Sequence, residues 1–156
     1  METANVWTIR QATPADRAFL EGLAPRLAIG IPPWRAAAAM TATMRGFLLE
    51  DLARMGPDAT VLIASGADGA PVGAATISRS THFTGSPQAD LGELAVVAEV
   101  EGQGAASALL AAAEAWARER GLSFVALATG AANTRARAFY ARHGYGDEDV
   151  RLVKPL

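Results

Sequence analysis

Apolar and polar positions in the first third of the chain follow two periods, one typical of strands and one of helices. Residues 6–10, VWTIR, alternate with a period of two and predict a short strand. The segment TPAD follows, with Thr13 as helix N-cap, Pro14 in the first helical position and Asp16 three residues after the cap. It predicts a helix that runs to about Ala28.

A second helix is expected from about Pro33 to the Gly56-Pro57 pair, which stops it. Apolar side chains recur along this segment at spacings of three and four, so they share one face of the helix. The residues on this face are Trp34, Ala37, Thr41, Met44, Leu48, Leu52 and Met55.

Three strands are expected in the middle of the chain. Residues 59–65 and 72–80 are rich in apolar and β-branched residues, and the turn sequence GADGAP between them predicts a hairpin. After a polar loop, residues 90–97 predict the third strand. An alanine-rich helix then runs to about Arg120 and ends at Gly121.

The C-terminal third predicts a strand, a helix and a last strand. Residues 122–129 are largely apolar, which is typical of a strand buried on both faces. A helix follows with Asn133 as N-cap and Gly144 as stop, and a final strand is expected within 149–156. The order strand, two helices, three strands, helix, strand, helix, strand predicts a single α/β domain over residues 1–156.

Composition narrows the class of protein. The 156 residues carry a formal net charge of −2, with acidic and basic residues interleaved, and include no cysteine. A disulfide framework, a cysteine metal site and a thiolate nucleophile are therefore excluded. No basic stripe of the kind that binds nucleic acid is visible, so no nucleic-acid partner is expected.

Neither a metal nor a membrane is expected as a partner. His82 and His143 lie far apart, without the spacing of metal ligands. No apolar run reaches the roughly 18 residues that would span a bilayer. The opening METANVWTIRQ lacks the basic-then-apolar pattern of a signal peptide, so a cytoplasmic protein is expected.

Two glycines, Gly102 and Gly104, lie between a predicted strand and a predicted helix. Such a turn leaves backbone N–H groups at the helix N-terminus without partners, and these groups favour a bound anion such as a phosphate. A P-loop is excluded because no lysine follows the glycines. A dinucleotide fingerprint is weak because Ser107 stands where its third glycine belongs and no acidic residue ends the next strand.

The stretch from Asp90 to Tyr145 resembles the GCN5-related N-acetyltransferases, the GNAT family. EGQGAA, residues 101–106, is similar to the family's turn Q/R-x-x-G-x-G/A, with Glu101 in place of the usual Arg or Gln. Asn133 and ARAFYARHGY, residues 136–145, match the family's second motif. The resemblance implies the GNAT fold, which is a mixed, mainly antiparallel sheet flanked by helices, and acetyl-CoA as co-substrate.

The resemblance also implies which residues bind acetyl-CoA. Leu94 and Ala95 would pair with the pantetheine arm, and the backbone N–H of Val96 would polarise the acetyl carbonyl. The turn and the start of its helix would hold the pyrophosphate through Gly102, Gln103, Gly104, Ala105, Ala106 and Ser107. Asn133 would contact the cofactor from the opposite side. We expect Glu101 to point to solvent while backbone groups bind the phosphates.

Two residues are candidates for the chemistry. The resemblance implies that Tyr140 faces the CoA sulfur and protonates it, whereas an ordinary half-buried helical aromatic is the alternative. Glu93 is the candidate base, because burial in an apolar strand would raise its pKa; otherwise strand alternation simply turns it to solvent. Arg135, Arg137 and Arg142 on the same helix as Tyr140 fit either a solvated face or a contact with phosphates.

The expected function is direct transfer of an acetyl group from acetyl-CoA to a primary amine of a small molecule or protein. A homodimer is possible because such assembly is common in the family. The alternative function is an acyl-CoA-binding module without turnover, which would bind CoA in a calorimeter and acetylate no amine.

Overall fold

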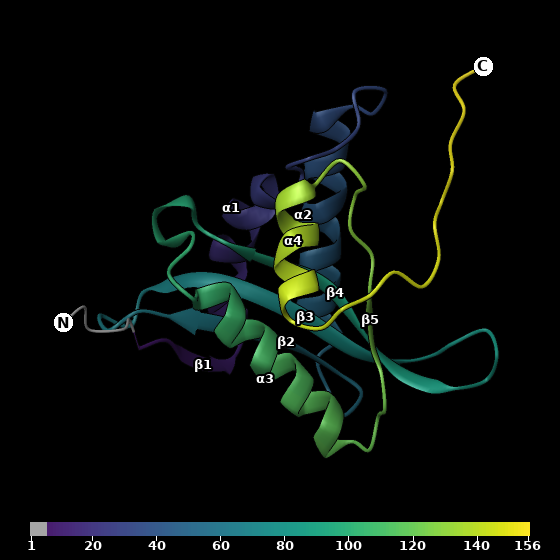
Figure 1. Ribbon diagram of the computed structural model, residues 1–156. Helices are drawn as coiled ribbons and strands as arrows, with labels where there is room; N and C mark the ends of the chain where they lie inside the picture. Colours follow the sequence, from purple (N-terminus) through teal and green to yellow (C-terminus); the bar gives the residue numbers. More distant parts are fainter. Residues whose placement is uncertain (1–5) are drawn as a thin grey trace.

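The computed structural model describes residues 6–156 as a twisted five-stranded sheet with helices on both faces (Figure 1). The strands lie in chain order across the sheet, the first four antiparallel and the fifth parallel to the fourth. The predicted mixed, mainly antiparallel fold is thereby confirmed. The strands are β1 (Thr8–Gln11), β2 (Ala59–Ser65), β3 (Pro71–Thr81), β4 (Pro87–Val96) and β5 (Val125–Leu127).

Four α-helices and two 3₁₀ turns complete the described part of the chain. They are η1 (Pro14–Asp16), α1 (Arg17–Leu27), α2 (Ala37–Ala53), η2 (Ala98–Val100), α3 (Ala105–Glu119) and α4 (Thr134–Arg142). The single domain over residues 1–156 stays a prediction. Residues 1–5, the start of the segment in which no signal-peptide pattern was found, lie outside the described residues.

Strand alternation divides the core into two layers. On β2, Val61 and Ile63 face α1 and α2, whereas Leu62 and Ala64 face α3. The layer under α3 includes Trp116, which is 7% exposed and lies on the inner face of that helix. Helices therefore cover both faces of the central strands.

The second helix begins later than the sequence predicts. Pro32 and Arg35 close a turn through a bond from Arg35 N to Pro32 O of 3.0 Å, and α2 starts only at Ala37. This turn leaves Trp34 54% exposed, outside the helix face on which periodicity had placed it. A proline pair favours such a turn because the first proline restricts the residue before it and neither donates a backbone bond.

Two predictions for the C-terminal third are wrong. The strand expected at 122–129 is only β5, three residues long and partly exposed rather than buried on both faces. The strand expected within 149–156 does not form, and its apolar residues Val150 and Leu152 are 75% and 88% exposed. Figure 1 shows this segment running away from the sheet. A strand needs a partner edge, and β5 is too short to offer one.

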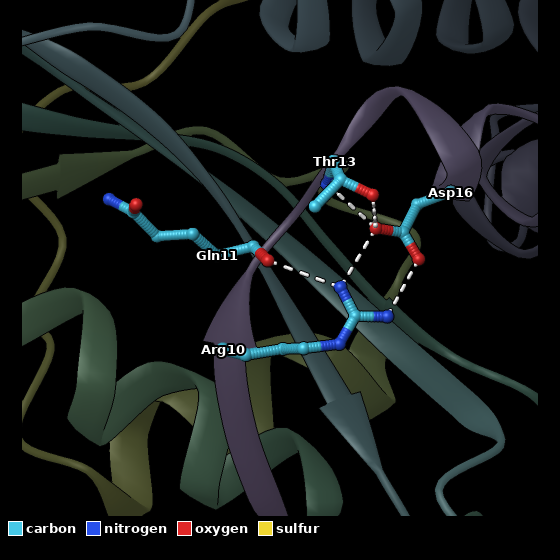
Figure 2. A network of polar contacts seen from close by, with 4 residues as sticks. All are labelled: Arg10, Gln11, Thr13 and Asp16. Carbon is cyan, nitrogen blue, oxygen red and sulfur yellow. Dashed lines mark hydrogen bonds and ion pairs between the residues drawn. The ribbon is translucent and has the colours of Figure 1, made fainter.

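An ion pair between a partly exposed arginine and a buried carboxylate lies at the start of α1 (Figure 2). Asp16 is 6% exposed and accepts two bonds of 2.8 Å from the guanidinium of Arg10 on β1. The same carboxylate accepts the backbone N–H of Thr13 at 2.7 Å, as the predicted capping box requires. The hydrogen bonds to Arg10 lower the pKa of Asp16 below its usual value.

Asp16→Asn should lower the free energy of unfolding at pH 7 by about 1–3 kcal/mol, because a charged, hydrogen-bonded pair is lost. The lowered pKa of Asp16 means that this stabilisation is present above the ordinary carboxyl pKa and is lost as pH falls through the folded-state value. Urea unfolding at pH 7 and near pH 3 measures both effects.

The matched control is Glu21→Gln, which breaks the exposed pair of Glu21 with Arg17 on the same helix. This change should cost less than about 0.5 kcal/mol. Equal losses in the two variants at pH 7 would contradict the role of the Asp16 pair.

Candidate active site

A bulge in β4 is the central feature of the site. Ala75 of β3 pairs with Leu94 and Ile77 pairs with Leu91, so Thr76 alone faces both Gly92 and Glu93. The Thr76 hydroxyl oxygen accepts the backbone N–H of Glu93 at 3.0 Å. A Cβ at Gly92 would come within 2.6 Å of that oxygen, so only glycine fits beside it.

The bulge coincides with the end of the pairing between β4 and β5. The two strands pair only from Ala89 to Leu91 of β4. Beyond Leu91, no strand among residues 6–156 pairs with β4 on that side. Residues 92–96 therefore form a strand edge without a partner strand, and an extended ligand could pair with those of its backbone groups that face outward and have no other partner.

The main chain of this edge alternates in direction. Val97 N donates to Val72 O of β3 at 2.8 Å, so antiparallel alternation turns the backbone groups of Val96 and Leu94 away from β3. Those of Ala95 turn toward β3, and its side chain is buried, so the expected pairing of Ala95 with the pantetheine arm does not fit this edge. The carbonyl of Val96 accepts Nε of Arg26 at 3.0 Å, which confirms that it faces outward.

The glycine turn follows the free edge. Gly102 and Gly104 have φ of +77° and +92°, a conformation that residues with a Cβ rarely adopt. Nothing lies within 4 Å of the Cβ position of Gly102, which leaves open space there. The indole of Trp7 anchors the turn by donating to Gln103 O at 2.9 Å. Sequence analysis missed this contact because 96 residues separate its partners.

The first turn of α3 continues from the glycines. Ala108 N makes a helical bond to Gly104 O at 3.0 Å, so the preceding N–H groups of Ala105, Ala106 and Ser107 have no intrahelical partner. The predicted turn residues are thus brought together at one helix N-terminus, where anions are favoured.

Glu101 does not point free into solvent as expected. Its side chain is 27% exposed and forms ion pairs with Arg26, at 2.7 Å, and with Arg135 of α4. The carboxylate therefore joins α1, the turn and α4.

Asn133 is occupied by structural contacts. Its side-chain oxygen accepts Ala136 N at 3.1 Å and caps α4, as predicted. Its amide donates to Ile29 O at 3.3 Å, and Gly30 packs so closely that a Cβ there would lie 2.7 Å from Asn133. Asn133 thus ties α4 to the loop that follows α1.

Tyr140 lies in an aromatic cluster on α4. Its ring is 5.2 Å from that of Phe139 and 5.6 Å from that of Tyr145, whose hydroxyl donates to Glu114 of α3 at 3.1 Å. Burial, with a contribution from the charge of Glu93, raises the pKa of Tyr140 to about 12. The tyrosine is therefore protonated at neutral pH, and it lies close enough to Glu93 for the charge of Glu93 to raise its pKa.

A cavity of about 380 Å³ opens beside the bulge, between α2 and the sheet. Four of its lining residues are acidic and one is basic. Arg54, the basic one, is paired with Asp51. The lining residues are Phe47, Glu50, Asp51, Arg54, Ala59, Thr60, Thr76, Ile77, Ser78, Asp90, Gly92 and Glu93.

Glu93 is the acid of this cavity that belongs to the β4 bulge. Burial, reinforced by the negative charge of Asp51, raises the pKa of Glu93 to about 7. A carboxyl group with this pKa exchanges a proton near neutral pH, as a general base must. Glu50 and Asp51 were not singled out from the sequence, because only the packing of α2 against α1 and β2 brings them to the cavity that Glu93 lines.

The sequence profile described as the acetyltransferase (GNAT) family matches residues 32–145, most of the chain. The chain belongs to the GNAT family. It is therefore an N-acetyltransferase that uses acetyl-CoA, as the two motifs had indicated.

Solved structures with the same fold share less than 25% of the sequence. Aminoglycoside N-acetyltransferase AAC(6')-Iy in complex with CoA is 22% identical, with a TM-score of 0.74 over 99% of this chain and 98% of that one. AAC(6')-IG from Acinetobacter haemolyticus is 19% identical, with a TM-score of 0.67 over 96% and 99%. A candidate acetyl transferase from Pyrococcus furiosus is 22% identical, with a TM-score of 0.77 over 97% and 100%. A search of proteins with curated functions gives no match.

Two features expected to be missing were also sought in the GNAT chain. Within residues 6–156, no cluster of three or more His, Cys, Asp or Glu side chains is placed to hold a metal ion. No helix in the same part of the chain has the length and apolar character to cross a bilayer.

Asp51→Asn should lower the pKa of Glu93 from about 7, because it removes the neighbouring negative charge, and should leave it above its ordinary value, because burial persists. Carboxyl ¹³C NMR titration measures the pKa, with the Glu93 signal assigned by its loss in Glu93→Gln. Glu50→Gln, on the same cavity, is the control and should shift the pKa less. Identical shifts in the two variants would contradict the specific influence of Asp51.

Proposed function

We propose that this GNAT enzyme acetylates a primary amine of a small, multiply charged cation, which binds in the acidic cavity with its reacting nitrogen at Glu93. The observation that carries the proposal is the position of Glu93. It belongs both to the bulge that opens the β4 edge and to the lining of the cavity.

The donor half of the proposed site is the free edge and the glycine turn. Leu94 and Val96 present outward-facing backbone groups for the pantetheine arm and the acetyl carbonyl, and Ala95 holds them in register through β3. Gly102, Gln103, Gly104, Ala105, Ala106 and Ser107 form the proposed pyrophosphate site. Open space at Gly102 and the uncapped N–H groups of α3 fit a phosphate. Asn133 contributes by tying α4 to the loop that follows α1.

The proposed chemistry starts with proton removal. An alkylamine with a pKa near 10.4 is mostly protonated at pH 7, so a base must take its proton before attack. Glu93 accepts that proton, directly or through water. The new N–C bond forms as the C–S bond of the thioester breaks, while the N–H of Val96 stabilises the carbonyl oxygen. Of the two protons lost by the ammonium group, one passes through Glu93 to solvent, and the other replaces the proton that Tyr140 gives to the CoA sulfur.

Tyr140 is the proposed donor to the departing sulfur. At a pKa of about 12 its hydroxyl is a weak acid, but part of that elevation comes from the charge of Glu93. Once Glu93 has taken a proton from the amine, this charge is neutralised and Tyr140 becomes the stronger acid. Proton transfer to Glu93 therefore makes Tyr140 a better proton donor before the sulfur departs.

The charge of the cavity favours a cationic acceptor. Glu50, Asp51 and Asp90 line it together with Glu93, and Arg54 compensates only part of their charge. The AAC(6')-Iy structure, with the same fold, belongs to an aminoglycoside N-acetyltransferase, and another structure of it contains a bisubstrate analogue, CoA-S-monomethyl-acetylneamine. These neighbours support a small-molecule acceptor with more than one amino group.

A cytoplasmic location and a homodimer remain parts of the proposal. The location is supported by the co-substrate, acetyl-CoA, which is available inside cells. The homodimer is supported only by the family resemblance.

In a thiol-release assay with acetyl-CoA, Glu93→Gln should lower kcat/KM by about 10²- to 10³-fold, because general-base catalysis is lost. The kcat/KM of the wild type should rise with pH through about 7, where Glu93 loses its proton, and then level off. In Glu93→Gln this rise should disappear and be replaced by the ionisation of the amine near pH 10.

Tyr140→Phe separates the role of the proton donor from that of the base. It should lower kcat by about 10- to 100-fold and keep the rise of kcat/KM with pH near 7. An unchanged kcat in Tyr140→Phe would remove the tyrosine from the chemistry. CoA binding without turnover of any amine would instead indicate a binding module.

Diamines and aminoglycosides should be acetylated with a lower KM than monoamines of similar length, because a second ammonium group meets the remaining carboxylates. Asp51→Asn should raise KM for a diamine by about 5- to 20-fold and change KM for a monoamine less. Glu99→Gln, which removes an exposed charge outside the cavity, is the control. Equal KM values for monoamines and diamines would contradict the cationic acceptor class.

A further inference from the structure

Glu101 stands where the GNAT turn usually carries Arg or Gln. Positive charge is nevertheless present here, supplied by other parts of the chain. Two guanidinium groups from distant parts of the chain meet at its carboxylate. Arg26, in the last turn of α1, reaches one oxygen at 2.7 Å, and Arg135, in the first turn of α4, is paired with the other. The local sum is one negative and two positive charges.

The three side chains lie where a diphosphate would bind. Glu101 directly precedes Gly102, the first glycine of the turn. Arg26 also donates Nε to the carbonyl of Val96 at 3.0 Å, so it connects the free β4 edge to the turn. Arg135 lies two residues after Asn133, the N-cap that fixes α4 beside the loop following α1. The ion pair of Glu101 with Arg135 thus connects the glycine turn to α4.

We propose that the Glu101 carboxylate occupies the place of a cofactor phosphate in the free enzyme, and that Arg135 and Arg26 transfer from Glu101 to the CoA pyrophosphate when it binds. The inference rests on acetyl-CoA as the donor, and it assigns the phosphate-binding cations to α1 and α4 instead of the turn itself.

The exchange follows from the chemistry of the groups. A guanidinium binds carboxylate and phosphate with the same planar, two-pronged geometry, so one ligand replaces the other without rebuilding the site. A pyrophosphate carries more negative charge than one carboxylate and has more acceptor oxygens. Arg135 is 71% exposed, so its side chain is free to turn toward an incoming ligand. Glu101 therefore competes with CoA for both arginines and lowers its affinity.

The test is calorimetric titration of CoA into the wild type, Arg135→Gln and Glu101→Gln. Arg135→Gln should weaken CoA binding by about 5- to 10-fold, because a charged contact to phosphate is lost. Glu101→Gln should tighten it by about 3- to 10-fold, because the competing carboxylate is removed. Thermal unfolding followed by circular dichroism establishes that both variants are folded.

Matched controls separate the exchange from a change in net charge. Arg142→Gln removes the same charge from α4 seven residues later, about two helical turns away. Glu99→Gln removes a carboxylate two residues before Glu101 that is exposed. Both should change the dissociation constant of CoA by less than about 2-fold. S-acetylpantetheine, which lacks the pyrophosphate, should bind the wild type, Arg135→Gln and Glu101→Gln equally.

The outcomes distinguish this inference from the proposed function. If the wild type binds CoA and Arg135→Gln behaves as Arg142→Gln does, the exchange is wrong and the enzyme assignment stands. Weaker CoA binding by Glu101→Gln also overturns it, because the carboxylate would then support the site rather than compete for it. A wild type that binds no CoA would remove the donor and, with it, both proposals.

Discussion

One hydrogen bond, from the backbone N–H of Glu93 to the Thr76 hydroxyl, marks the constraint on which the rest of the site depends. It closes a bulge in which two residues of β4 face one residue of β3. The extra residue ends the pairing with β5 after Leu91, which opens the strand edge that follows. It also places Glu93 on the wall of the cavity under α2. Binding edge and candidate base therefore arise from a single irregularity in the sheet.

How far the sequence predicts this arrangement depends on the range of the interactions. Local patterns were sufficient for β2 and α3, for the Thr13–Asp16 box and for the glycine turn, because their determinants lie within a few residues. For the bulge, the only local indication in the sequence is Gly92 within an apolar segment. A bulge is a one-residue shift in register between two strands, so it also depends on the partner strand β3. The bond from Trp7 to Gln103 and the approach of Asp51 to Glu93 depend on tertiary packing, which periodicity does not encode.

The error at residues 149–156 has the same origin. Val150, Leu152 and Val153 have strand propensity, but a strand forms only beside a partner with free hydrogen-bonding groups. The neighbour that the predicted order offered, β5, has three residues. Residues 149–156 therefore form no strand, because the sheet offers them no edge long enough to pair with. β5 is shorter than predicted because β4 turns away from it at the bulge, after Leu91.

Charge is distributed across the β4 edge in a way that the net charge of −2 conceals. On the α2 side, Glu50, Asp51, Asp90 and Glu93 collect around the cavity, whereas Arg26 and Arg135 collect at the glycine turn. In the proposed complex, the cationic amine would lie on the acidic side and the anionic acetyl-CoA on the basic side, so each substrate would be attracted to its own side. The ion pairs with Glu101 offset part of the positive charge of Arg26 and Arg135. A glutamate in the proposed phosphate-binding turn is therefore compatible with anion binding, because its one negative charge is outnumbered by the two guanidinium groups beside it.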